Sequence, residues 1–415
     1  MPAPPAVRYV DRLPGTVDMV IIGGGVVGAA TAFFATRAGL RVAVLEARPR
    51  LATLTTAAST GAFRLQFDNP EEIALVREGI ELFSEFGVRT GLEDWELGLT
   101  FGGYLFGALT DKAADRARRL VQHQRAWGLT DVELLDGDEA RHRFPYLSVE
   151  VRGARFRAGD GWLDPRRLAL GYVAAASNPA RIPNARAGGG AVVATSCRVT
   201  ALAIDARGRV DGVVTDRGAV SAESVVIAAG PLSGEVSALG GLSIDLRPTT
   251  RQKLVFPDLP EVPADAPMTI EEETAAHWRP NGGGCFALWT DPGAQSSEAT
   301  NDPVPDQTWA FGLLDPSSDH ALARLSPFWK DVWARGTDNW YLQAGQYEYT
   351  PDRRPFLGPT RVAGLMLNTG YSGHGVMASA AGSRIVVDLL TGAMPPEANS
   401  FHVDREIVAR EQDIL

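Results

Sequence analysis

Three glycines near the start of the chain have the spacing that binds the phosphates of a dinucleotide. Gly23, Gly25 and Gly28 stand in the segment Gly23-Gly24-Gly25-Val26-Val27-Gly28. In such a turn the first glycine permits a tight bend, the second lets the backbone approach a pyrophosphate, and the third lets a helix pack closely on a strand. The helix N-terminus then offers free backbone donors and a partial positive charge. The spacing alone is a weak signal, so its value depends on the neighbouring elements.

These neighbouring elements complete a strand, turn, helix and strand unit. A β-type run over 18–22 precedes the glycines, and a segment with helical spacing follows over 26–38. A second apolar strand over 40–45 ends at Glu46, whose carboxylate can accept hydrogen bonds from ribose hydroxyls. The unit favours FAD or NAD over a cofactor with a 2′-phosphate, and disfavours an ordinary glycine turn.

Helical and β-type segments continue along the rest of the chain. Periodicity predicts helices over 69–87 and 111–127, and Asp164-Pro165 predicts the start of another over 166–176. The Gly-rich stretch 187–190 is interpreted as a loop, and a last helix is expected over 376–390, after a loop over 369–375. Predicted strands, several of which suit an antiparallel sheet, are 99–109, 198–204, 210–215, 219–221, 224–228, 254–256, 286–289, 309–313, 341–348 and 365–368.

Five further motifs give the chain a resemblance to a known family. They are Ala58-Ser59-Thr60-Gly61, Gly161-Trp162-Leu163-Asp164-Pro165, Val225-Val226-Ile227-Ala228-Ala229-Gly230, Tyr349-Thr350-Pro351-Asp352 and Gly370-Tyr371-Ser372-Gly373-His374-Gly375. Together with the first turn they resemble the D-amino-acid oxidase superfamily, especially its sarcosine oxidase, glycine oxidase and dimethylglycine dehydrogenase branch. The resemblance extends from Val17 to Gly392 and implies FAD as the cofactor.

The resemblance also implies the fold. We expect an α/β Rossmann-like FAD-binding domain and an α+β substrate domain with a mixed or antiparallel sheet. A chain of 415 residues is long enough for two such cores. The FAD-binding domain is expected to be discontinuous, over 17–92, 155–246 and 346–395, and the substrate domain to occupy 93–154 and 247–345.

By the same resemblance, the cofactor-binding residues come from several segments. The 59–61 segment would lie against the flavin and its pyrophosphate, and Val199 would flank the adenine. The loop over 370–375 leads into a helix N-terminus, whose backbone donors can stabilise negative charge on a reduced flavin. The full expected set is Gly23, Gly25, Val27, Gly28, Glu46, Ala58, Ser59, Thr60, Gly61, Arg64, Val199, Ala229, Gly230, Gly370, Ser372, Gly373, His374 and Gly375.

The chain departs from some relatives at two kinds of position. Gly345 stands where those relatives attach flavin through Cys, and the segment 59–63 contains no His, so we expect noncovalent FAD. On an approximate register, Phe67 and Met377 stand where sarcosine oxidases use Arg and Lys to hold a carboxylate. Simple sarcosine is therefore not the expected substrate.

Five side chains are candidates for catalysis. His277 and Arg279 belong to a segment that resembles the family strand facing the flavin, and they could bind a polar or anionic substrate group, although Arg279 could equally be structural. Arg64 would lie close to the isoalloxazine unless it is a surface Arg. His374 is expected to act in positioning rather than proton transfer. Lys253 could assist oxygen, because the stretch 283–289 has no Lys, or be a surface residue.

The implied reaction moves a hydride from a substrate carbon bearing nitrogen to FAD, and water then hydrolyses the imine. The expected partners are a small-molecule amine or amino acid, together with oxygen or an electron carrier. Two alternatives stay open: an FAD-dependent 2-hydroxy-acid or glycerol-phosphate dehydrogenase, and a flavin-bearing subunit that relays electrons. Assays with amines and hydroxy acids would separate the first alternative from the main interpretation.

Composition excludes other classes of partner. A net charge of −10 and a pI near 5.2 argue against nucleic acid. The cluster Arg116, Arg118 and Arg119 is interpreted as a solvated helix face. Cys197 and Cys285 belong to no CxxC pair, so neither a metal site nor a disulfide is expected. Residues 1–16 carry four prolines and no signal-peptide core, which predicts a mobile arm. We expect a cytoplasmic protein without a membrane span.

Overall fold

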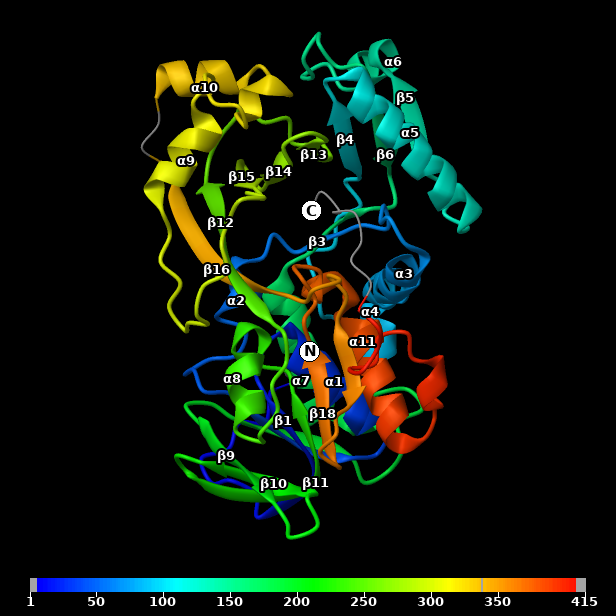
Figure 1. Cartoon of the computed structure of the whole chain (residues 1–415), viewed down its shortest axis with the longest axis vertical. Helices are drawn as coiled ribbons and strands as arrows, with labels where there is room; N and C mark the ends of the chain where they lie inside the picture. Colours follow the sequence, from blue (N-terminus) through cyan, green and yellow to red (C-terminus); the bar gives the residue numbers. More distant parts are fainter. Residues whose placement is uncertain (1–5, 337–338, 408–415) are drawn as a thin grey trace.

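Two large sheets of eight strands each organise the chain, and the computed structural model describes residues 6–336 and 339–407. Figure 1 shows the two sheets in separate halves of the molecule along its long axis. The helices are α1 (Val26–Arg37), α2 (Thr55–Ala58), α3 (Pro70–Ser84), α4 (Phe86–Thr90), α5 (Asp111–Ala126), α6 (Gly137–Arg143), α7 (Pro165–Ser177), α8 (Ser233–Ala238), α9 (Gln307–Leu314), α10 (Trp329–Arg335) and α11 (Gly375–Thr391), with short 3-10 turns η1 (Pro179–Arg181), η2 (Gly230–Leu232), η3 (Leu322–Arg324) and η4 (Pro396–Ala398).

The first sheet has a parallel core. Its strand order is β17 (Phe356–Pro359), β18 (Leu365–Thr369), β11 (Gly218–Ile227), β1 (Thr16–Ile22), β2 (Arg41–Leu45) and β8 (Gly190–Ala194), with β10 (Val210–Thr215) and β9 (Val199–Ile204) extending from β11. Strands β1, β2, β8, β11 and β18 are parallel to one another, so their carboxyl ends meet at one edge. Ligands of such sheets bind at that edge.

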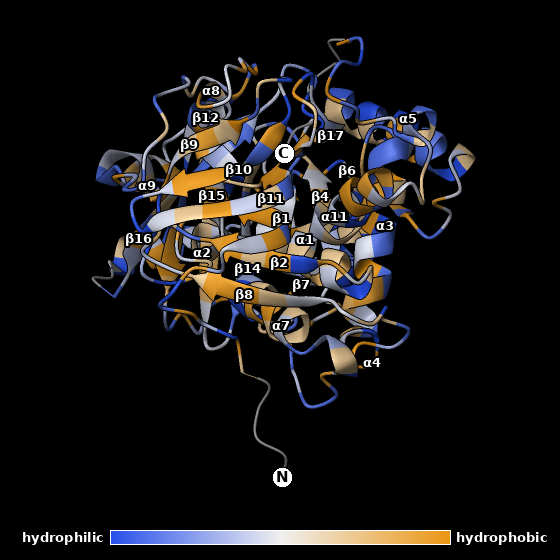
Figure 2. Cartoon of the chain, turned by 90° about the horizontal axis from the view of Figure 1, so that it is seen from below, coloured by the Kyte–Doolittle hydropathy of each residue, from blue (hydrophilic) through white to orange (hydrophobic). Residues whose placement is uncertain are grey.

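Both faces of β1 are buried, which explains its nearly continuous apolar sequence. Met19 and Ile21 pack in the core that also contains α1, α7 and α11, whereas Val20 and Ile22 pack in the core that contains the β9–β10 hairpin. Figure 2 shows the apolar strands at the centre, with the polar face of α5 toward the outside. The glycine turn after Ile22 is therefore held by a rigid, fully covered strand.

The second sheet is mixed. Its order is β16 (Tyr341–Tyr349), β12 (Arg247–Phe256), β15 (Gly284–Trp289), β14 (Ala276–Asn281), β13 (Met268–Glu271), β4 (Tyr104–Ala108), β6 (Gly153–Arg157) and β5 (Glu133–Asp136), and only β13 and β4 pair in parallel. A small third sheet joins β3 (Ala62–Phe63) to β7 (Gly161–Trp162). These sheets confirm the predicted combination of a Rossmann-like part with a mixed-sheet part. The exact domain boundaries remain a proposal.

Side chains alternate across the second sheet. Leu254, Cys285 and Trp278 lie on the face that packs against α9 and α10. Lys253, His277 and Leu288 form one row on the opposite face, because Lys253 and His277 both pair with Leu288. Phe286 and Arg279 form the next row of that face. The second sheet thus carries an apolar core on one side and basic groups on the other.

Several local predictions were wrong. The run 309–313 is not a strand but part of α9, whose N-terminus is capped by Asp306 through the N–H of Thr308. The Gly-rich stretch is a loop over 187–189, as predicted, but Gly190 already belongs to β8, and 218–227 form one continuous strand where two were predicted. Residues 6–15 are not a free arm, because Val10 donates its N–H to Val193 O and Tyr9 forms a bridge with Val193; residues 1–5 lie outside the described part.

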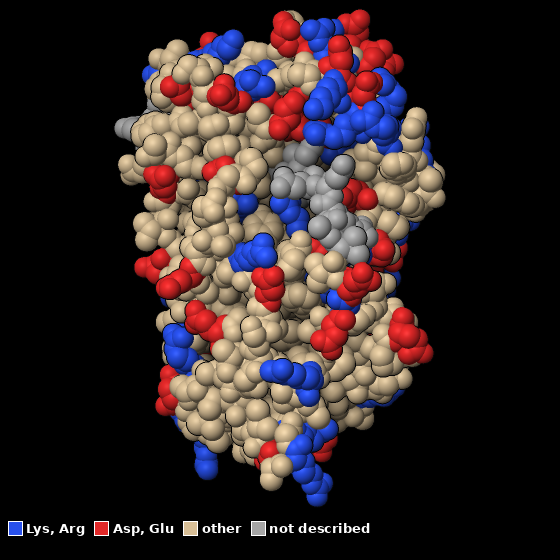
Figure 3. All heavy atoms as spheres, in the orientation of Figure 1, with Lys and Arg blue, Asp and Glu red and all other residues tan. Residues whose placement is uncertain are grey.

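Two local predictions on helices α7 and α5 were confirmed. Helix α7 begins with Pro165, and Asp164 accepts hydrogen bonds from the N–H groups of Arg166 and Arg167. Arg116, Arg118 and Arg119 are exposed on α5, and basic side chains gather over α5 and α6 in Figure 3 together with acidic ones. No helix in the described ranges is long and apolar enough to cross a membrane.

Candidate functional site

The glycine turn joins β1 to α1 with almost no free space. Gly23 has a φ of +113°, and a Cβ there would lie 2.4 Å from Ala228 O. A Cβ at Gly28 would lie 1.9 Å from Gly23 O. A Cβ at Gly25 would meet only the Thr56 hydroxyl, at 3.3 Å. Gly23 and Gly28 are therefore required by the fold, whereas Gly25 leaves open space at the N-terminus of α1.

Glu46 closes this turn from the end of β2. Its carboxylate accepts hydrogen bonds from the N–H groups of Gly24, at 2.8 Å, and Arg48, at 2.7 Å. Burial raises the pKa of Glu46, and these two backbone bonds oppose that rise. Each carboxylate oxygen keeps a second lone pair, so Glu46 can hold the turn and still accept a ribose hydroxyl.

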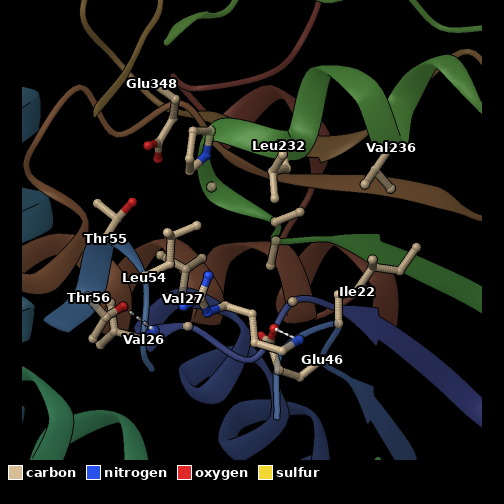
Figure 4. Close-up of a pocket in the computed structure, with 18 of the residues that line it drawn as sticks. Ile22, Val26, Val27, Glu46, Leu54, Thr55, Thr56, Leu232, Val236 and Glu348 are labelled. Atoms are coloured by element: carbon tan, nitrogen blue, oxygen red, sulfur yellow. Dashed lines mark hydrogen bonds between the residues drawn. The ribbon is translucent and has the colours of Figure 1, made fainter. Parts of the chain in front are cut away.

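A cavity opens along the carboxyl edge of the first sheet. Glu46 and Glu348 lie on opposite sides of it, and the N-terminus of α1, marked by Val26 and Val27, lies between them (Figure 4). Thr56 Oγ1 accepts a hydrogen bond of 3.1 Å from the Val26 N–H. The remaining wall includes residues 45–48, 52–56, 197–199 and 228–232, together with Ser59, Tyr347, Gly373, Gly375 and Val376.

This cavity fits a dinucleotide. Gly25 leaves open space at the N-terminus of α1, where a pyrophosphate would be stabilised. Glu46, at the end of the second strand, is the acid that would bind the ribose. The predicted residues Val27, Val199, Ala229 and Gly230 all belong to the cavity wall. Residues of the first sheet would therefore hold the adenosine and pyrophosphate parts of the cofactor.

The 58–61 segment connects the cavity to the basic face of the second sheet. Ser59 O accepts a hydrogen bond of 2.9 Å from Lys253 Nζ, and Thr60 O accepts one of 2.6 Å from Arg279. Gly61 has a φ of +70°, and a Cβ there would lie 1.9 Å from Leu163 O. The segment is fixed in place by contacts from both halves of the molecule.

Lys253 and Arg279 lie together on the ring of Phe286. Lys253 Nζ is 4.3 Å from the ring centroid, and Arg279 Cζ is 4.5 Å from it. Each residue is only 3% exposed. Burial, with Arg279 as a second cause, lowers the pKa of Lys253 to about 7, and burial lowers the pKa of Arg279 to about 10. Burial, rather than a neighbouring acid, therefore dominates the surroundings of both basic groups.

His277 lies beside this pair but is not a third cation. Burial lowers its pKa to about 4, and Nδ1 is 2.7 Å from Ala275 O. A carbonyl oxygen can only accept, so Nδ1 carries the proton and Nε2 keeps its lone pair. His277 is therefore suited to accept a hydrogen bond rather than to attract an anion.

Arg64 and His374 both contact the ring of Phe67. The Arg64 guanidinium lies 4.3 Å above the Phe67 ring and donates to Gln66 O at 2.8 Å. The His374 ring packs edge-on against Phe67, and Nδ1 is 3.2 Å from Glu72 Oε1. Both side chains are buried, and neither lines the cavity described above. A positioning role for His374 fits its bond to Glu72.

The loop over 370–375 contributes in two ways. Gly373 and Gly375 line the cavity beside the N-terminus of α11. The N–H groups of Gly370 and Tyr371 act to lower the pKa of Glu348, and Ser372 Oγ accepts from the Thr350 N–H at 3.3 Å. The part of this loop that lines the cavity is therefore its helix end.

Among the cavity residues that sequence reasoning missed, three carry polar side chains that bear on the chemistry of the site. Thr56 caps the Val26 N–H, and its only signal was its place among small hydroxyl residues just before the 58–61 motif. Tyr347 and Glu348 both line the cavity from β16. An acid between two tyrosines of a predicted strand was a weak sign, because alternation normally places such a residue toward solvent.

A covalent link is disfavoured by the packing at Gly345. A Cβ there would lie 2.9 Å from Ala58 Cβ, and both described cysteines, Cys197 and Cys285, are free. We predict that denaturation with acid and removal of the polypeptide leaves all the flavin in solution. Flavin absorbance that stays with the precipitated polypeptide would disprove this prediction.

Comparisons with known proteins agree with this geometry. Human sarcosine dehydrogenase, mitochondrial (Homo sapiens), is 26% identical over 379 residues, which cover 88% of this chain and 38% of that protein. Glycine oxidase of Geobacillus kaustophilus (strain HTA426) is 28% identical over 391 residues, which cover 90% of this chain and 92% of that protein. The solved structure of glycine oxidase from Geobacillus kaustophilus superposes with a TM-score of 0.78 at 23% identity, covering 95% of this chain and all of that one.

The chain therefore spans well under half of the sarcosine dehydrogenase that it matches but nearly all of the glycine oxidase. Residues 18–389 match the model of the family described as DAO, FAD dependent oxidoreductase. That match confirms the resemblance, the FAD cofactor and the oxidoreductase class that the motifs implied. The protein belongs to the DAO family of FAD-dependent oxidoreductases.

Proposed function

We propose that this enzyme oxidises a carbon–nitrogen bond of an amine or N-alkyl amino acid that carries a carboxylate. One observation carries the proposal: two buried basic side chains, Lys253 and Arg279, face the 58–61 segment, and no acid in the described part of the chain forms an ion pair with either. Relatives named for glycine and for sarcosine support the same class of substrate. FAD, when bound, supplies the acceptor for the hydride.

The missing acid is the central feature of this site. Within the described ranges, Lys253 and Arg279 donate only to the backbone carbonyls of Ser59, Thr60 and Pro280, and Arg279 Nε has no hydrogen-bond partner. Burying a charge without a counterion lowers the stability of the folded protein by roughly several kcal/mol. A carboxylate brought by the substrate would offset that cost, and a guanidinium is suited to bind it through two parallel hydrogen bonds.

The two cations have separate proposed roles. Arg279 binds the carboxylate of the substrate, and Nε2 of His277 accepts a hydrogen bond from its nitrogen. Lys253, which is bonded to the segment expected against the flavin, provides positive charge when electrons pass to oxygen. Water then hydrolyses the imine to a carbonyl compound and an amine.

Replacing Lys253 tests the second role. Lys253→Met is expected to slow reoxidation of the reduced enzyme by oxygen about ten-fold or more, because a fixed cation near the developing negative charge is lost. Anaerobic reduction by substrate should change little. Lys112→Met, which removes an exposed lysine on α5, is the matched control. Stopped-flow measurement of both half-reactions decides: unchanged reoxidation removes Lys253 from this role, and slowing of reduction alone assigns it to the substrate.

A substrate panel tests the proposed function against its alternatives. Amino acids and N-alkyl amino acids are assayed beside 2-hydroxy acids and glycerol phosphate, with an artificial electron acceptor and with oxygen. Turnover of the amines supports the proposal, and turnover of hydroxy acids alone replaces it with the dehydrogenase alternative. If no compound is turned over until a partner protein is added, the electron-relay alternative gains.

A further inference from the structure

Glu348 is a buried acid whose presence the proposed reaction does not explain. It is 8% exposed, lies on β16 and lines the cofactor cavity. Its own backbone N–H and those of Gly370 and Tyr371 act to lower the pKa of this carboxyl, whereas burial raises it by more. No Lys, Arg or His in the described part of the chain forms an ion pair with it. Any negative charge on this group is therefore stabilised by nearby backbone N–H groups and by no ion pair among the described residues.

The groups around Glu348 offer no hidden counterion. Burial raises the pKa values of Tyr347 on β16 and of Tyr371 in the loop between β18 and α11. The charge of Glu348 is a further cause of both shifts. Arg251 on β12 donates to the Tyr349 hydroxyl and to Asp291 O instead.

The other charged groups near the cavity are either bonded elsewhere, as Arg48 is to Thr53 and Asn301, or exposed, as Arg198 is. His374 is bonded to Glu72, and Glu235 on α8 is an exposed acid of the cavity wall. Burial raises the pKa of Glu348 to about 7, so its charge is not fixed near neutral pH.

Glu348 lies on the side of the cavity where the flavin is expected. Glu46, on one side of the cavity, is expected to bind the ribose. The glycine turn, in the middle, is expected to bind the pyrophosphate. Glu348 lies on the opposite side, beside the Thr55 wall, and its carboxylate points toward the cavity in Figure 4. A dinucleotide that spans the cavity from Glu46 therefore extends its flavin toward Glu348.

We propose that Glu348 takes up a proton whenever the bound flavin is reduced, so that the buried cavity gains no net negative charge. The electrons and atoms balance as follows. Two electrons and one proton reach the flavin, either as a hydride when a substrate C–H bond breaks or from a chemical reductant. A further proton from water binds the Glu348 carboxylate and converts it to the neutral acid. The proposal rests on FAD occupying this cavity but not on the identity of the substrate.

The pH dependence of the flavin midpoint potential tests the proposal without any substrate. The potential of the purified holoenzyme is measured against reference dyes on both sides of neutrality. Between the pKa values of Glu348 in the oxidised and reduced enzyme, the slope is expected to be twice that of Glu348→Gln, because one additional proton accompanies each electron pair. Above neutral pH, Glu348→Gln should also have the higher potential, because a negative charge has been removed.

Two further variants and one direct measurement complete the test. Glu348→Asp keeps a carboxylate and should keep the doubled slope over a shifted pH window. Glu235→Gln removes an exposed acid from the same cavity and should leave the slope unchanged. Photoreduction in weak buffer with an indicator dye should show one more proton taken up by the wild type than by Glu348→Gln.

Equal slopes and equal proton uptake in the wild type and Glu348→Gln would overturn the proposal. If Glu348→Gln does not retain FAD, the wild type alone decides, because a single-proton slope over the whole pH range would also overturn it. Substrate turnover does not enter these measurements. Failure here therefore leaves the proposed amine oxidation standing, and failure of the substrate panel leaves this test intact.

Discussion

Gly25→Val is expected to produce a folded protein that has lost nearly all of its FAD. Gly25 has a φ of −76°, which any residue adopts, and an added Cβ meets only the Thr56 hydroxyl at 3.3 Å. The fold therefore tolerates the change, while the valine methyl groups occupy the space through which the pyrophosphate approaches the backbone. Flavin content per chain and far-UV circular dichroism measure the two parts of this expectation.

Two other variants of this turn are expected to give different outcomes. Glu46→Ala should weaken FAD retention without abolishing it, because it removes the ribose acceptor and the bonds to Gly24 and Arg48 but leaves the pyrophosphate site open. Gly28→Ala should instead lower the yield of folded protein, since its Cβ would lie 1.9 Å from Gly23 O. Normal flavin content in both Gly25→Val and Glu46→Ala would contradict the assignment of this turn.

Arg279→Met is expected to lower kcat/KM for a carboxylate-bearing amine by about thirty-fold or more. Losing one partner of a buried charged pair costs about 2 kcal/mol or more, and each 1.4 kcal/mol corresponds to about ten-fold. Methionine keeps much of the apolar stem over Phe286, so packing should change less than charge. Steady-state kinetics with the best amine of the panel measure the loss.

The corresponding amide or ester of the same amine provides the internal control. It has no carboxylate, so wild type and Arg279→Met should turn it over at similar, low efficiency. Arg251→Met removes another arginine from the same sheet face, one bonded to Tyr349 and Asp291, and should have a small effect. An equal loss for the acid and its amide would show that Arg279 is structural.

Local sequence correctly predicted the strand, glycine turn, helix and second strand that begin the chain's first sheet. Strand, glycine turn and helix are adjacent in sequence, and each glycine acts on atoms within a few residues or on one neighbouring strand. The strand predicted over 309–313 failed because an apolar run without alternation does not separate strand from buried helix, and the cap at Asp306 was not recognised. Strand β8 was missed because its first residue is the last of a Gly-rich stretch.

The surroundings of Lys253 and Glu348 could not be predicted locally, because they depend on contacts between distant segments. Lys253 is buried because Ser59, 194 positions away, supplies its acceptor, and Phe286 on the neighbouring strand covers it. No local pattern shows that a lysine has such partners, so a surface position was a reasonable alternative. The surroundings of Glu348 likewise depend on a distant segment, because the backbone N–H groups of Gly370 and Tyr371 influence its pKa.

Anaerobic mixing of the purified enzyme with single compounds tests the central claim most directly. The claim predicts that a carboxylate-bearing amine bleaches the flavin in one turnover, that each reduced flavin is matched by one carbonyl product after hydrolysis, and that Arg279→Met slows this bleaching. Bleaching by 2-hydroxy acids or glycerol phosphate, with no response to any amine, would contradict it.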